Sequence, residues 1–147
     1  MKNELSVQPV VEVEGLRHFL LELREALLRL HKALIESERA GYEKTFGRIA
    51  SPYQFLQLLT SDAWFAWLRP VSQIIAAMDE KLDAKVLLTK ADAKTLADQV
   101  KTLLVAASGS EGFSGHYDAA LQRDPDVVFA HSDVAKVIRA FKRWPPS

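Results

Sequence analysis

Six leucines recur at alternating spacings of four and three early in the chain: Leu16, Leu20, Leu23, Leu27, Leu30 and Leu34. This spacing places them on one face of an amphipathic helix. Flanking residues widen that face, with Phe19, Ala26 and Ala33 on one side and a second stripe spaced by sevens on the other: Leu21, Leu28, Ile35 and Tyr42. One neighbouring helix cannot cover so wide a face. The helix is therefore either central in its own domain or in contact with another chain through the second stripe.

The boundaries of this first helix are indicated by the residues around it. We expect it to run from about Val13 to about Lys44 and to end at Gly47, because glycine suits the left-handed conformation of a helix C-cap. The preceding segment is rich in β-branched residues and is interrupted by Pro9. It predicts an extended N-terminal arm over residues 1–12.

Three polar residues are placed to cap later helices: Ser51, Thr89 and Asp124. A proline directly follows two of them, at the favoured first position of a helix. Glycines and serines predict a loop over residues 108–115, followed by a short helix over 116–122. The last helix carries an apolar stripe with a histidine in it: Val128, His131, Val134, Ile138 and Phe141.

The segment over residues 62–80 combines two tryptophans with an Arg-Pro pair. Trp64 and Trp67 share a face with the aliphatic residues that follow them, and Arg69 falls on the opposite face. Pro70 cannot donate a hydrogen bond to the carbonyl of Ala66, so a continuous helix would bend there. The pattern favours a tryptophan-rich core layer with a surface arginine. The alternative is an aromatic pocket in which Arg69 binds an anion and the free carbonyl lines the site.

Together these elements predict an all-α fold, an antiparallel four-helix bundle with a long helix 1, a Pro-bent second arm over residues 51–84 and two shorter helices. A length of 147 residues suits a single domain that spans the whole chain, 1–147. We expect part of the long hairpin to stay uncovered and to be available to a partner chain.

Composition excludes several classes of function. The chain has 19 basic and 19 acidic residues, so no overall field steers it to nucleic acid or to an anionic membrane. It has no cysteine, which excludes disulfides and Cys-ligated metal and fits a cytoplasmic location. The N-terminal residues do not form a signal peptide, and no apolar run reaches the ~20 residues of a membrane-spanning helix.

Histidines are the main candidates for chemistry. Metal-binding bundles use Glu-x-x-His on facing helices, and no histidine here has a glutamate three residues before it. His31 borders the leucine face and His131 lies on the apolar stripe of the last helix, so the two could converge in the core with Glu38, Asp79 or Tyr42. A hydrogen-bonded core histidine is the commoner outcome for such residues, and no cofactor is predicted.

Other chemical motifs are weak. The segment GSEGFSG lacks the lysine and the preceding strand of a phosphate-binding loop. Four cations gather near the C-terminus: Lys136, Arg139, Lys142 and Arg143. The dipole of the last helix accounts for most of this cluster. Nucleic-acid binding through it would be salt-sensitive.

Three segments carry a resemblance: LHKALIESERAGYEK (30–44), SPYQFLQLLTSDAWFAWLRPVSQIIAAMDE (51–80) and LQRDPDVVFAHSDV (121–134). They are similar to a family of short all-helical bacterial proteins without a known activity. The resemblance covers most of the chain from about residue 30. It implies a bacterial origin and an all-helical fold, and it brings no catalytic residue.

These observations lead to two main hypotheses. The first is a non-enzymatic, cytoplasmic helical interaction module that forms a homodimer through helix 1 and the second arm, with a further protein partner as an option. The second is a bundle that binds a metal or small ligand through His31 and His131 and could be an enzyme. Four further candidates would lie near the two histidines: Trp64, Trp67, Arg69 and Asp79.

Overall fold

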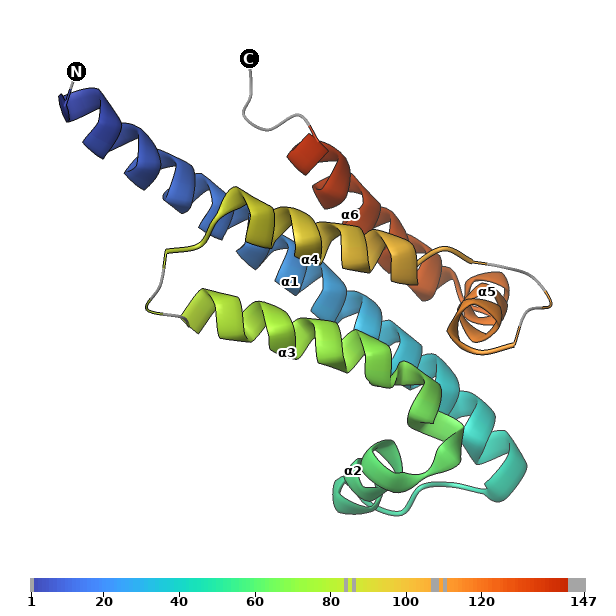
Figure 1. Ribbon diagram of the computed structural model, residues 1–147. Coiled ribbons are helices and arrows are strands. Elements are labelled where there is room, and N and C mark those ends of the chain that lie inside the picture. Colours follow the sequence, from blue (N-terminus) through green and yellow to red (C-terminus); the bar gives the residue numbers. More distant parts are fainter. Residues whose placement is uncertain (1, 84, 86, 107–108, 110, 143–147) are drawn as a thin grey trace.

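The computed structural model describes residues 2–83, 85, 87–106, 109 and 111–142, with side chains from residue 13 to residue 141. Over this part of the chain the fold is all-helical, as expected (Figure 1). The elements are α1 (Lys2–Phe46), α2 (Pro52–Ser61), the 3-10 helix η1 (Ala63–Leu68), α3 (Arg69–Asp83), α4 (Lys90–Leu103), α5 (Phe113–Arg123) and α6 (Pro125–Lys142). No described helix combines the length and the apolar character that crossing a membrane requires.

α1 is the central helix. Its most extensive contact is with α6, and it also packs against α3, η1 and α4 (Figure 1). All six leucines of its main stripe are buried, each at most 1% exposed. Full burial of a leucine side chain stabilises a fold by about 1.5–3 kcal/mol, so this stripe supplies a large part of the hydrophobic core.

The second stripe of α1 is covered mainly by the same chain. Leu28, Ile35 and Tyr42 are partly buried against the core. Leu21 is 40% exposed. The central position of α1 in its own fold therefore accounts for most of its wide apolar face.

The extended N-terminal arm is not observed, because α1 begins at Lys2. The physical reason is that adding residues to an existing helix costs far less than starting one. Pro9 removes one hydrogen bond from this stretch but leaves the helix continuous. Residue 1 lies outside the described residues. In Figure 1 the first turns of α1 project beyond α3 and α4.

The second arm consists of three helices, α2, η1 and α3, and Pro70 lies at the start of the third where a bend was expected. Ser51 caps α2 by accepting a hydrogen bond from the Gln54 N–H, and Asp62 caps η1 in the same way through the Trp64 N–H. Pro70 is the second residue of α3, where a missing N–H costs little. The proline thus helps to begin a helix and does not bend one.

The later helices begin close to the expected caps. Thr89 and Asp92 form a complete capping box at the start of α4. Asp124 accepts a hydrogen bond from the Asp126 N–H at the start of α6. α5 begins at Phe113, three residues before the expected 116, so the last part of the predicted Gly/Ser loop is helical. Residues 108 and 110 of that loop lie outside the described part of the chain.

The buried face of α6 is rotated from the expected stripe. Val127, Ala130, Val134 and Ile138 are buried, whereas Val128 and Phe129 are exposed. Both sets satisfy the three–four spacing, and packing against α1 selects the set that starts at Val127. His131 and Phe141 lie half-buried at the border of this face.

Candidate functional site

The tryptophans and Arg69 have separate partners. The Trp64 indole N–H donates to the Glu38 carbonyl at 3.2 Å. Trp67 stacks on His116, with ring centroids 5.1 Å apart, and its indole N–H is buried without an acceptor among the described residues. Arg69 donates to the Thr60 carbonyl at 3.2 Å, at the end of α2.

The carbonyl that Pro70 was expected to leave free has a donor. The Arg69 backbone N–H donates to the carbonyl of Ala66, at the junction of η1 and α3. The pocket hypothesis required Arg69 to bind an anion and this carbonyl to line the site. Instead, the Arg69 side chain binds the end of α2, and the Ala66 carbonyl accepts a hydrogen bond where η1 meets α3.

Glu38 forms an ion pair that was not predicted from the sequence. It is a charged residue only 7% exposed, on α1. Arg123, the last residue of α5, donates to the Glu38 carboxylate at 2.6 Å and to the Ser37 hydroxyl at 2.9 Å. An arginine at the end of a helix usually compensates the helix dipole, so no sequence signal distinguishes this one.

The remaining candidates, His31 on α1 and Asp79 on α3, each have a partner on the other of these two helices. Asp79 accepts a hydrogen bond from Arg24. His31 Nε2 lies 3.3 Å from the Ser72 hydroxyl, and burial lowers the pKa of His31. Within the described residues, no three histidine, aspartate or glutamate side chains are grouped so that they could hold a metal ion.

His131 has a buried partner. Its Nδ1 lies 2.6 Å from the hydroxyl of Tyr117 on α5, which is fully buried. Burial raises the pKa of Tyr117 and lowers the pKa of His131, so both groups are neutral near pH 7. A buried tyrosine hydroxyl needs an acceptor, which favours donation from Tyr117 to Nδ1. The proton of the neutral ring is then on Nε2.

His131 also lines a cavity of about 280 Å³ beside the C-terminal end of α4, which we call the α4–α6 pocket. The other lining residues are Lys101, Leu104, Val134, Ala135, Ile138 and Arg139. The walls are apolar, and the polar groups are two cations and one imidazole. Sequence reasoning singled out His131 and Arg139 but not their proximity, and it missed Lys101 and Tyr117.

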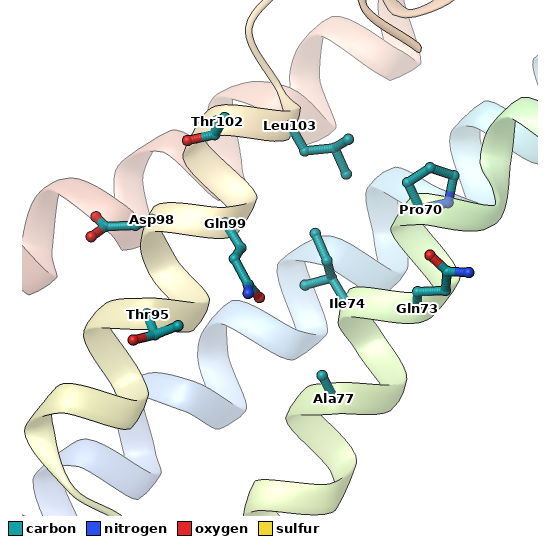
Figure 2. Close-up of a pocket in the computed structure, with 9 residues that line it drawn as sticks. All are labelled: Pro70, Gln73, Ile74, Ala77, Thr95, Asp98, Gln99, Thr102 and Leu103. Carbon is teal, nitrogen blue, oxygen red and sulfur yellow. The ribbon is translucent and has the colours of Figure 1, made fainter. Parts of the chain in front are cut away.

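The other cavities have a different chemistry. Figure 2 shows a broad groove between α3 and α4, with Ile74, Ala77, Gln99 and Leu103 facing the space between the helices and Asp98 directed away. Its polar groups are amides and hydroxyls with one carboxylate and no cation. Two further pockets border α1 and include several acidic residues each. Of these pockets, the α4–α6 pocket is the one whose lining combines cations with no carboxylate.

The C-terminal cations are only partly described. Lys136 and Arg139 are exposed on α6. The side chain of Lys142 and all of Arg143 lie outside the described residues.

Comparisons of the chain with protein-family models, with curated proteins and with solved structures found no match.

Proposed function

We propose that this protein is a non-enzymatic, cytoplasmic interaction module that forms a homodimer, built on an antiparallel four-helix bundle of α1, α3, α4 and α6. The contacts α1–α3, α3–α4, α4–α6 and α6–α1 support the bundle, because each helix then has two neighbours in a closed ring. The remaining helices connect the bundle or extend from it.

The observation that carries the interaction role is the surface of α2. This ten-residue helix contains no charged residue, and none of its residues is buried. Tyr53 and Leu56 lie on one exposed face, at 70% and 59% exposure. Phe46, at the end of α1 that lies toward α2, is 64% exposed (Figure 1). Large apolar side chains exposed together mark an interaction surface.

A second copy of the chain fits this surface better than a charged partner. In a symmetric dimer the same patch lies on both sides of the contact, so a charged group near the two-fold axis would face its own copy. α2 has none, and the net charge of zero removes repulsion between whole chains. A stable interface buries about 800 Å² per partner, so we expect the contact to extend from α2 to the end of α1. The proposed contact therefore involves the second arm and the C-terminal end of α1.

The test is the mass of the protein in solution at tens of micromolar, by native mass spectrometry and light scattering. We expect a dimer for the native chain and a monomer for Leu56→Glu, because the variant brings two carboxylates together in the apolar contact. The fold should be unchanged, since Leu56 is exposed, and circular dichroism checks this.

Val105→Glu is the matched control. Val105 is 60% exposed just after α4 and is not part of α2. It should leave the dimer intact. A monomeric native chain, or a Leu56→Glu variant that stays dimeric, would contradict the proposal.

The second hypothesis, ligand binding at His31 and His131, is supported at one of its two residues. His31 lies against Ser72 on α3, whereas His131 lines the α4–α6 pocket. A metal shared by the two is therefore less favoured than a small ligand at His131 alone.

A further inference from the structure

We propose that the α4–α6 pocket binds a small organic carboxylate that carries a short apolar group. The carboxylate lies among Lys101, Arg139 and the Nε2–H of His131, and the apolar group packs on Leu104, Val134 and Ile138. This site is separate from the α2 surface and goes beyond the proposed interaction role.

Charge distribution is the first argument. The whole chain has equal numbers of acidic and basic residues, yet the described residues that line this pocket include two cations and no carboxylate. Lys101 lies in the last turn of α4 and Arg139 close to the end of α6, positions where the helix dipole favours cations. With no acidic side chain in the lining, both cations are available to an external anion.

The second argument is the orientation of His131. Its Nδ1 is held at 2.6 Å by the hydroxyl of Tyr117, which is itself fully buried. The opposite nitrogen, Nε2, carries the proton and has no acceptor among the described residues of the chain. A fixed donor beside two cations suits an anionic oxygen, and it argues against a metal ion, which needs an unprotonated nitrogen.

The third argument is size and lining. A volume of about 280 Å³ lies just below the roughly 300–1,000 Å³ of sites for drug-sized ligands, so the ligand is small. Aliphatic side chains make most of the wall. They favour a carboxylate with an alkyl group over a fully hydrated inorganic anion, because burial of the alkyl group adds binding energy.

Isothermal titration calorimetry on the full chain tests this with four probes: hexanoate, hexanol, hexylamine and inorganic phosphate. We expect binding of hexanoate at millimolar concentrations and much weaker binding of the other three. Equal binding of hexylamine would overturn the role of the cations. Equal binding of phosphate or of hexanol would overturn the class of ligand, and absence of hexanoate binding would overturn the site.

Variants locate the binding. Arg139→Gln should weaken hexanoate binding about tenfold, which is typical of one lost charge-assisted hydrogen bond. Lys136→Gln is the matched control, since Lys136 is an exposed cation on the same helix that does not line the pocket. Equal loss in the two variants would show attraction to general positive charge and would overturn the proposal.

Tyr117 is a positioning residue in this site, and its role has a spectroscopic readout. The ¹⁵N chemical shifts of the His131 ring distinguish a proton on Nε2 from one on Nδ1. We expect the Nε2 form in the native chain and a mixture in Tyr117→Phe, with weaker hexanoate binding. Predominance of the Nδ1 form in the native chain would overturn the proposed orientation.

Discussion

Two tryptophans three residues apart show how closely a side chain's environment depends on its neighbours. Trp64 donates its indole N–H to the Glu38 carbonyl on α1. Trp67 packs against Phe113 and His116 and has a buried N–H without an acceptor among the described residues. A buried donor without an acceptor costs about 1–3 kcal/mol, so aromatic packing must offset that cost at Trp67.

This difference predicts unequal effects of the same substitution. Trp64→Phe removes a hydrogen bond, whereas Trp67→Phe removes an unpaired donor, and the loss of ring volume is the same. We expect Trp64→Phe to lower the free energy of unfolding by about 1 kcal/mol more than Trp67→Phe does. Urea unfolding followed by circular dichroism measures both. Equal losses would mean that the hydrogen bond to Glu38 contributes nothing.

At the scale of elements, one ion pair connects the junction of α5 and α6 to the central helix. Arg123 at the end of α5 is bound to Glu38 and Ser37 on α1. Glu38 is nearly inaccessible, whereas the Arg123 side chain is 43% exposed. Solvent therefore screens the charge of Arg123, whereas the buried carboxylate of Glu38 depends on Arg123 to compensate its charge.

We expect Arg123→Met to destabilise the protein by about 2 kcal/mol. This is less than the roughly 3–5 kcal/mol for breaking a fully buried pair, because the arginine is partly exposed. Adding Glu38→Gln should restore part of the loss, since it removes the unpaired buried charge. Arg24→Met, at the half-exposed pair with Asp79, is the control and should cost less than about 1 kcal/mol. Strictly additive losses at Arg123 and Glu38 would exclude the coupling.

Capping residues predicted the helix boundaries that they mark, whereas the start of α1 and the relations between elements were not predicted. Gly47, Ser51, Thr89 and Asp124 act within a few residues of their own position, so the sequence shows them directly. The pairing of Arg123 with Glu38 joins residues far apart in the chain, and no local pattern contains it. The rotation of α6 is of the same kind, because only packing against α1 distinguishes Val127 from Val128.

The candidate site follows the same rule. His131 was recognisable from its place on an apolar stripe. Its partner Tyr117 and its neighbour Lys101 come from different helices, so they depend on how α4, α5 and α6 pack together. The sequence therefore predicted His131 as a candidate, but it did not predict the hydrogen bond with Tyr117 or the nearby cation Lys101.

For the whole molecule, the two half-buried histidines predict the response of stability to pH. Burial lowers the pKa values of His31 and His131 below that of unfolded histidine, near 6.5. The unfolded chain then takes up protons first as the pH falls. The stabilisation that depends on neutral His31 and His131 is complete above the pKa of unfolded histidine. It is lost as the pH falls from that pKa toward the lowered pKa values of the folded state.

We expect the free energy of unfolding to decrease as the pH is lowered from about 7.5 to about 5, and to decrease less in the double variant His31→Gln with His131→Gln. Urea unfolding at a series of pH values measures this. Asp92 has a lowered pKa because of its hydrogen bonds with Thr89, so its contribution is lost only in more acidic solution, below about pH 4. Parallel pH profiles for the native chain and the double variant would contradict the prediction.

The pairing of α1 with α6 also has a consequence for how the chain is made. The leucines of α1 leave the ribosome before their largest partner, which begins at Pro125 and follows only after α2 to α5. At roughly 5–20 residues per second, several seconds of synthesis separate the two. During that time the broad apolar face of α1 lacks its largest partner, so we expect the nascent chain to expose a surface of the kind that chaperones for apolar segments bind.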